Sequence, residues 1–333
     1  MIAMPIASER IVITHRDHLE LLPWQAPDPA PGEVRIRVGQ SAVSFGDIML
    51  RRHVFRPRPA VTVPGYEVVG TIDAVGPDAG DVRVGNRVAA FVEYGGNARH
   101  ALVPARNLVH LPDRVESDAA AAVVLNYATA LGLVETAGLV AGDDVLVHGA
   151  SGGVGTAVLD TARALDLRAI GATRNVTASL FGARLVDGRS PTLVRDVREA
   201  SGGGVRAVFD SRAGRSLWSS RAMLRPGGSL VVFGLSSVAN RGVRAALGTV
   251  GTLASLTLFR VLPGKRSSLF AMDRTFHRDP ARVRAWVGRA IDMLARGAIA
   301  PAIGARLPLA SVAEAHRLVE TGAIVGKVVL DCQ

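Results

Sequence analysis

The pattern of apolar and polar positions divides the chain into two parts of different character. Up to about Leu111, short runs with strand-like alternation are separated by turns rich in proline and glycine. The runs cover residues 33–38, 66–72 and 87–94, and the turns cover 26–33 and 75–81. This pattern predicts a small β-rich domain.

From about Ala119 onward, apolar strand-like segments alternate with segments that have helical spacing. Strands are predicted at 144–150, 167–173, 205–211 and 228–234, with helices that end near Leu165 and Leu224. Such alternation is typical of a parallel sheet, so an α/β domain follows the β-rich one. The basic stretch 236–274 has no clear pattern and is expected to be a connection.

Near the end of the chain, two helices and a strand are predicted. The first helix covers about 281–296. The second opens at Ser311, because Ser311 and Glu314 have the spacing of a capping box, and the strand covers 326–330.

A cluster of small residues lies between the strand at 144–150 and the helix that follows it. Three of them occupy the three glycine positions of the G-x-G-x-x-G fingerprint, with alanine at the first. Small residues there let the backbone approach a pyrophosphate, which the helix N-terminus attracts. The alternative is an ordinary tight turn without a ligand. The candidate binding residues are Ala150, Ser151, Gly152, Gly153, Val154 and Gly155.

The end of the next strand indicates which dinucleotide is bound. An NAD site has a carboxylate there for the ribose 2′-hydroxyl, whereas an NADP site has a cation for the 2′-phosphate. Here the strand ends in Thr173, Arg174 and Asn175, so Arg174 is expected to pair with the 2′-phosphate, supported by the Thr173 hydroxyl. The sequence therefore favours NADPH, although a solvated loop arginine would look the same.

Composition limits the class of protein. A chain of 333 residues suggests two domains, and we expect a soluble, cytoplasmic protein because no signal peptide is recognisable and no apolar run approaches membrane-spanning length. Cys332 is the single cysteine, which excludes an intrachain disulfide and a cysteine-based structural zinc site.

The net charge of +10 raises the question of an anionic partner. Arginine carries it almost entirely, since Lys265 and Lys327 are the only lysines. The arginines are scattered and aromatic residues make up 5%, so nucleic acid is not the expected partner. An anionic cofactor or a phosphopantetheine-linked substrate would use the same charge.

Several segments together resemble the medium-chain dehydrogenase/reductase superfamily, and within it the zinc-free quinone oxidoreductases, which include zeta-crystallin and vesicle amine transport protein homologues. The segments are 44–52, 63–76, 84–112, 126–130, 145–155, 224–234 and 315–330. The resemblance implies a GroES-like catalytic domain formed by 1–122 and 265–333, and a Rossmann NADPH-binding domain formed by 123–264. It also implies a homodimer.

The residues at the zinc positions of this superfamily argue against a metal. Zinc-dependent relatives have a cysteine ligand where this chain has Ser44 and a histidine ligand where it has Tyr66, and they carry a four-cysteine lobe that is absent from this sequence. Without a metal, hydride needs an acceptor that is already electrophilic. Quinones and carbon–carbon double bonds conjugated to a carbonyl meet this condition.

The resemblance also assigns residues around the nicotinamide. Asn126, Tyr127 and Thr129 would lie near it, and Phe233, Gly234 and Leu235 would line its other side. Tyr127 and Thr129 are candidate catalytic residues. The alternatives are that Tyr127 is an aromatic residue of the core and that the Thr129 hydroxyl bonds to the backbone of its own helix.

Two charged residues leave alternatives open. Asp47 matches an aspartate of the family and is either catalytic or a buried structural acid. Lys327 either reaches the cofactor or lies at a strand end.

The substrate pocket is where this chain departs from its relatives. Ser44, Met49 and Phe55 replace residues that are larger or more polar in many of them, which predicts a pocket for a large apolar substrate. Phe55 lacks the hydroxyl that could protonate a reduced carbon, so His53 is a candidate proton donor. The alternative is that His53 lies in a surface loop and has no catalytic role.

The sequence thus predicts an NADPH-dependent, zinc-independent oxidoreductase of the quinone oxidoreductase or enoyl reductase type, acting on a small molecule without nucleic acid or membrane partners. Two alternatives remain. One is a tailoring reductase of secondary metabolism, in which hydride addition to a polyene triggers ring closure. The other is a non-catalytic dinucleotide-binding protein.

Overall fold

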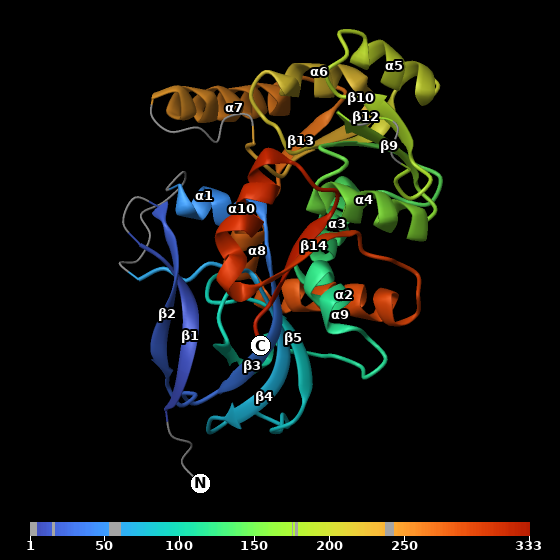
Figure 1. Ribbon diagram of the computed structural model, residues 1–333. Coiled ribbons are helices and arrows are strands. Elements are labelled where there is room, and N and C mark those ends of the chain that lie inside the picture. The colour runs from blue at the N-terminus through green and yellow to red at the C-terminus, as the bar shows by residue number, and fades with distance from the viewer. Residues whose placement is uncertain (1–4, 15–16, 53–60, 175, 177–178, 237–242) are drawn as a thin grey trace. The chain divides into compact units, whose positions relative to one another are not determined.

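The computed structural model describes residues 5–14, 17–52, 61–174, 176, 179–236 and 243–333. The chain forms two compact units (Figure 1). The first unit combines Met1–Ala128 with Asp273–Gln333, and the second is Thr129–Met272. The chain therefore leaves the first unit within helix α3 (Asn126–Ala137) and returns to it near α8 (Met272–Arg278).

A mixed seven-stranded sheet is the centre of the first unit. Its strand order is β14-β15-β3-β4-β5-β7, with β6 paired to β3, and β14 and β15 run parallel while the other pairs are antiparallel. A separate hairpin pairs β1 (Ile6–Ile13) with β2 (Leu19–Ala26). The strands of the large sheet are β3 (Glu33–Val43), β4 (Glu67–Val75), β5 (Arg87–Phe91), β6 (His100–Pro104), β7 (Val109–His110), β14 (Ile303–Pro308) and β15 (Lys327–Asp331).

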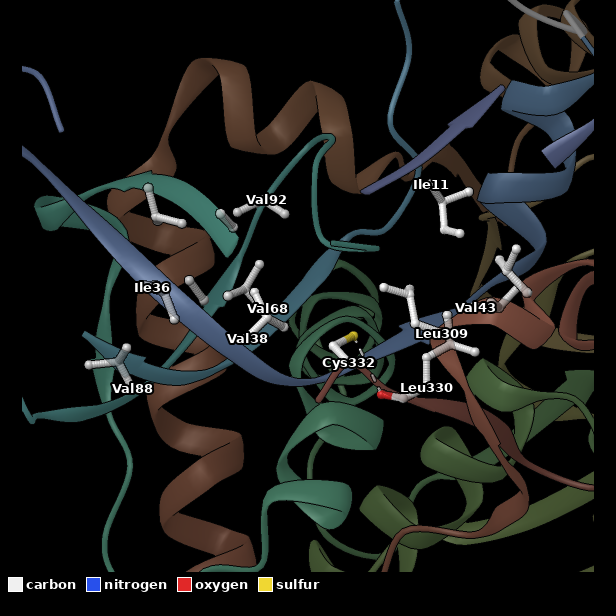
Figure 2. Packing of buried hydrophobic residues seen from close by; sticks show 14 of the residues in the cluster. Ile11, Ile36, Val38, Val43, Val68, Val88, Val92, Leu309, Leu330 and Cys332 are labelled. Atoms are coloured by element: carbon white, nitrogen blue, oxygen red, sulfur yellow. Dashed lines mark hydrogen bonds between the residues drawn. The ribbon is translucent and has the colours of Figure 1, made fainter. Parts of the chain in front are cut away.

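One hydrophobic core joins the two ends of the chain in this unit. Figure 2 shows Ile36, Val38 and Val68 from the N-terminal strands in one cluster with Leu330 of the C-terminal strand and with Cys332, which follows that strand. Alternating apolar positions place these side chains on one side of their strands. The helices of the unit are α1 (Phe45–Arg51), α2 (Ser117–Val124), α8, α9 (Pro280–Ala295) and α10 (Val312–Thr321), with short 3₁₀ turns at Ala105–Asn107 and Leu309–Ser311.

A six-stranded parallel sheet forms the second unit. Its order is β10-β9-β8-β11-β12-β13, the arrangement of a doubly wound dinucleotide-binding sheet. The predicted α/β fold, a GroES-like unit and a Rossmann unit, is confirmed. The strands are β8 (Asp144–His148), β9 (Arg168–Thr173), β10 (Arg184–Asp187), β11 (Val205–Asp210), β12 (Leu224–Val232) and β13 (Arg266–Leu269). The helices are α3, α4 (Gly153–Ala164), α5 (Leu193–Ala200), α6 (Ser216–Met223) and α7 (Val243–Val261).

The stretch 236–274, expected to be an unpatterned connection, contains the long helix α7 and the edge strand β13. Leu256 and Phe259 of α7 are buried in the core of the second unit, whereas Val250 and Val261 are exposed. Because apolar residues lie on both sides of this helix, its sequence lacks the polar stripe that reveals a surface helix.

The predicted capping box at the start of α10 is also wrong. Ser311 is the N-cap residue, but its side chain makes no capping hydrogen bond, and the Glu314 carboxylate accepts two hydrogen bonds from Arg317. Arg317 competes for the carboxylate because residues three apart lie on the same helix face.

One stretch is longer and more apolar than the sequence analysis expected. Ser117–Ala137, which covers α2 and α3, could cross a membrane by length and composition, and an 18-residue window within it has a mean hydropathy of 1.4. However, 72% of this window is buried inside the protein. Its apolar character therefore serves packing.

Candidate functional site

The glycine turn lies where the strand order of the Rossmann sheet reverses. Strand β8 ends at His148 between β9 and β11, and α4 begins at Gly153. The backbone N–H groups of Gly149 and Ala150 donate to the carbonyl oxygen of Ala172 at 3.1 and 3.2 Å, which ties the turn to β9. Ligands of such sheets bind at the carboxyl ends of the strands at this switch point.

Close packing explains the small residues of the turn. A Cβ atom on Gly155 would overlap the carbonyl oxygen of Gly149 and lie 2.8 Å from the Cα atom of Ala150. The methyl group of Ala150, at the first fingerprint position, is buried and packs over Gly171, where a Cβ atom would lie 2.8 Å from it. Gly171 on β9 thus makes room for the alanine.

The end of β9 meets the turn and two neighbouring loops. The Thr173 hydroxyl donates to the Ser151 hydroxyl at 3.3 Å, and the Gly188 N–H donates to the Thr173 carbonyl oxygen at 2.9 Å. The guanidinium of Arg212 in turn donates to the Gly188 carbonyl oxygen at 3.1 Å. These contacts gather the loops that follow β9, β10 and β11.

Three exposed arginines belong to these gathered loops. Arg174 follows β9, Arg189 follows β10 and Arg212 follows β11. One carboxylate oxygen of Asp187, at the end of β10, accepts a hydrogen bond from the backbone N–H of Arg189 at 2.9 Å. Arg174 was predicted from the sequence, whereas Arg189 and Arg212 were not, although each of them comes directly after a strand end in the same way.

A buried network supports the turn from within the unit. The carboxylate of Asp210 accepts hydrogen bonds from the backbone of Arg212 and Ala213 and from the hydroxyl of Ser220, which lies 3.0 Å from Nε2 of His148. Burial tends to raise the pKa of Asp210, but His148 and these donors hold it below its usual range. Burial lowers the pKa of His148. The network fixes the ends of β8 and β11.

The other residues assigned to the nicotinamide lie on α3 and directly after β12. Asn126, Tyr127 and Thr129 are buried at the start of α3. The Phe233 N–H donates to the carbonyl oxygen of Asp210 at 3.0 Å, and a Cβ atom on Gly234 would lie 2.8 Å from the carbonyl oxygen of Ser211. The segment Phe233–Leu235 therefore lies against the loop that follows β11.

In the GroES-like unit, Asp47 is a fully buried acid in α1. Its Oδ2 atom accepts hydrogen bonds from the backbone N–H of Ser44 at 2.8 Å and from the Ser44 hydroxyl at 2.9 Å. Its Oδ1 atom accepts one from the Gly65 N–H at 2.8 Å. Burial raises the pKa of Asp47, while these donors act in the opposite direction. The acid thus links α1 to the turn before β4.

Lys327, one of the residues assigned to the cofactor, is 2% exposed and forms an ion pair with the buried Glu67. Burial is the main cause that raises the pKa of Glu67 to about 7; Asp47 adds to the effect and Lys327 opposes it. The lysine ammonium is therefore directed at a carboxylate inside the unit.

The pocket residues are only partly within the structure. Ser44 and Met49 on α1 are half-buried, whereas His53, Phe55 and Asn175 lie outside the described residues. The ring of Tyr66 packs over Gly46, where a Cβ atom would lie 3.0 Å from it, and it stacks on Phe91 with 6.0 Å between ring centroids. Helix α1 thus presents a partly apolar surface beside an aromatic pair.

A GroES-like unit joined to a Rossmann unit with a phosphate-binding turn defines a nucleotide-dependent oxidoreductase. The model of the alcohol dehydrogenase GroES-like domain matches residues 30–113, and the model described as zinc-binding dehydrogenase matches 181–330. The chain belongs to the medium-chain dehydrogenase/reductase superfamily, in its quinone oxidoreductase branch.

Individual relatives cover nearly the whole chain. The quinone oxidoreductase of Pseudomonas aeruginosa is 30% identical over 323 residues, which covers 94% of this chain and 95% of that protein. The mouse synaptic vesicle membrane protein VAT-1 homolog is 28% identical over 322 residues, covering 94% and 79%. A mycobacterial protein solved in complex with NADPH has a TM-score of 0.83 and 29% identity, covering 97% and 99%.

The name of one matching model implies a zinc ion, but the residues here do not fit one. Ser44 and Tyr66 stand at the two ligand positions, and the oxygens of Asp47 already accept three hydrogen bonds. The ammonium of Lys327 supplies positive charge nearby. Within the described ranges, no group of three histidine, cysteine or acidic side chains could hold a metal.

Proposed function

We propose that this protein is an NADPH-dependent, zinc-independent reductase that delivers hydride to a quinone or to a conjugated carbon–carbon double bond of a large apolar substrate. The observation that carries this proposal is the glycine turn at the switch point, with exposed arginines on the three loops that meet beside it. The helix N-terminus would bind the pyrophosphate, and the guanidinium groups would bind a 2′-phosphate. These two features together match NADPH. The related mycobacterial protein in complex with NADPH supports the same choice.

NADPH supplies the hydride, and the protein positions the two reactants. Ala150–Gly155 hold the pyrophosphate, Thr173 and Arg174 hold the 2′-phosphate, and Asn126, Thr129 and Phe233–Leu235 hold the nicotinamide. The acceptor carbon gains a C–H bond, and its electron pair moves to a conjugated oxygen, which then needs a hydrogen bond and a proton. Because the residues do not fit zinc, side chains must provide both.

The proton comes from one of a few groups. His53 is the first candidate, with Tyr127 and solvent as the others. If His53 supplies it, His53→Phe slows the chemical step by roughly two to four orders of magnitude in single turnovers and leaves NADPH binding intact. Activity within a few-fold of wild type would assign the step to Tyr127 or solvent.

The test of the proposed function is NADPH oxidation with a panel of quinones and enones of increasing apolar length. We expect longer substrates to be reduced faster, because binding energy from remote apolar atoms positions the double bond. Small quinones should be slow. Product analysis separates simple reduction from the alternative in which a polyene cyclises. Tight NADPH binding without turnover of any acceptor would instead identify a non-catalytic dinucleotide-binding protein.

We further propose that the protein is a cytoplasmic homodimer formed through the β13 edge of the Rossmann sheet. Strand β13 pairs with β12 on one side and ends the sheet on the other. Val250, Leu253 and Val261 of the adjoining helix α7 are exposed. A second copy would cover these groups and pair the open strand edge. Light scattering should give twice the chain mass, and Leu253→Glu should give the monomer.

A further inference from the structure

Three buried ionisable groups meet in the GroES-like unit at the ends of three elements. Asp47 lies in the first turn of α1, Glu67 begins β4, and Lys327 begins β15. All three are buried, and Lys327 pairs with the Oε1 atom of Glu67. The Oε2 atom of Glu67 makes no hydrogen bond within the described part of the chain. We call these residues the buried triad.

The charges of the buried triad do not balance when all three groups are ionised. Two carboxylates and one ammonium leave one negative charge, and an uncompensated buried charge is costly. Asp47 accepts three hydrogen bonds, which stabilise its ionised form. Glu67 is held by the ammonium and by the backbone of Tyr66, but its Oε2 atom has no hydrogen-bond partner within the described residues, so Glu67 is the group that takes up a proton.

We propose that Lys327 is a built-in cation that compensates the buried carboxylates and is not a ligand of the cofactor. Asp47 holds both Ser44 and Gly65, so the charge of the triad determines whether α1 stays attached to the turn before β4. Lys327 is thereby a positioning residue for Ser44. Only the turnover measurement below rests on the proposed function.

Three variants test this role at pH 8.5. Lys327→Met leaves two carboxylates without a cation and should lower the melting temperature by about 5 to 10 °C. Adding Glu67→Gln to Lys327→Met should restore at least half of this loss, because glutamine carries no charge. Lys265→Met, which changes the other lysine of the chain, should have little effect. Turnover should fall at least tenfold in Lys327→Met and recover in the double variant.

Binding of NADPH distinguishes the two roles of Lys327. If Lys327 is a built-in cation, we expect Lys327→Met and the double variant, where they fold, to have NADPH dissociation constants within about threefold of the wild-type value. A loss of tenfold or more in both variants would instead make Lys327 a cofactor ligand and overturn the proposal. So would a double variant as unstable as Lys327→Met. If Lys327→Met does not fold, the double variant decides alone, since its folding supports the proposal and its failure overturns it.

Glu67→Gln alone gives an independent measurement. The pKa of Glu67 is raised from 4.5 to about 7 by burial, so the folded protein binds more protons than the unfolded chain between these values. The contribution of Glu67 to stability therefore falls as pH rises from about 4.5 to 7, so the stability of the wild type relative to Glu67→Gln should fall over this range. If the stability of Glu67→Gln has the same slope against pH as that of the wild type over this range, the role proposed for the buried triad is wrong. A wild-type protein that oxidises no NADPH would refute the proposed function and leave these melting temperatures valid.

Discussion

The proposed site makes Arg174 the residue on which cofactor choice should depend most directly. Its exposed side chain follows β9, at the position that meets the 2′-phosphate in NADP-binding sheets. Arg174→Ala should reduce the preference for NADPH over NADH by about 1.5 to 3 kcal/mol, because a charge-assisted hydrogen bond is lost. Dissociation constants for both cofactors measure this preference. Arg195→Ala, at an exposed arginine on α5 of the same unit, is the control, and equal affinities in the wild type would contradict the assignment.

Gly155 tests the geometry of the turn. A methyl group there would overlap the Gly149 carbonyl oxygen, so Gly155→Ala must move α4 away from the turn. We expect a destabilisation of about 2 kcal/mol or more and a loss of NADPH affinity, measured by urea unfolding and by titration. Gly288→Ala in α9, where a Cβ atom meets nothing within 4 Å, should stabilise the protein by about 0.5 to 1 kcal/mol. A neutral Gly155→Ala would show that the turn is loosely packed.

Single residues could be predicted where local spacing determines their role. The fingerprint residues and Arg174 follow from the chain order of one strand, one turn and the next strand. Arg189 and Arg212 could not be found in this way, because their loops meet Thr173 only through the order of the strands in the sheet. The pairing of Glu67 with Lys327 joins residues 260 positions apart, and no local pattern announces it.

Helix α1 depends on one carboxylate at its first turn. Asp47 accepts all three of its hydrogen bonds from backbone or hydroxyl donors, so Asp47→Asn must turn an amide N–H₂ toward one of them. We expect a loss of about 2 to 4 kcal/mol in the free energy of unfolding, measured in urea. Ser44→Ala keeps the backbone donors and should cost about 1 kcal/mol. If both variants lose the same amount, the Gly65 contact contributes nothing.

Elements were predictable from sequence where one face of each is clearly apolar. Strands β3, β4, β8 and β9 and helix α9 lie where alternation or helical spacing put them. Helix α7 was missed because apolar residues surround it, and β10 because Arg184–Asp187 is a four-residue edge strand with exposed ends. Short edge strands carry too few apolar positions to show a period.

At the scale of the whole molecule, the proposed zinc-independence can be tested directly. We expect no stoichiometric zinc in the purified protein by elemental analysis, and unchanged activity after prolonged treatment with a strong chelator. Added zinc should not raise the melting temperature, since the triad already contains its positive charge. One bound zinc per chain would refute this account of the site and of the electron-accepting substrate.

The architecture could be predicted because the order of strands and helices along the chain is visible in the sequence. Alternating strands and helices predict a parallel sheet, and the resemblance to the superfamily implied that both ends of the chain share one domain, whose common core Figure 2 shows for Val38 and Leu330. The acceptor could not be predicted in the same way, because residue types at three pocket positions describe its polarity and not its shape.

Cys332, the last residue but one, has a use in the laboratory. Its thiol is buried, its backbone N–H bonds to Gly39, and burial raises the pKa of the thiol to about 12. A thiol reagent can therefore modify the chain only after the C-terminal strand separates from β3. Because the sequence contains no other cysteine, the labelling rate reports how often this one sheet opens, without any engineered probe.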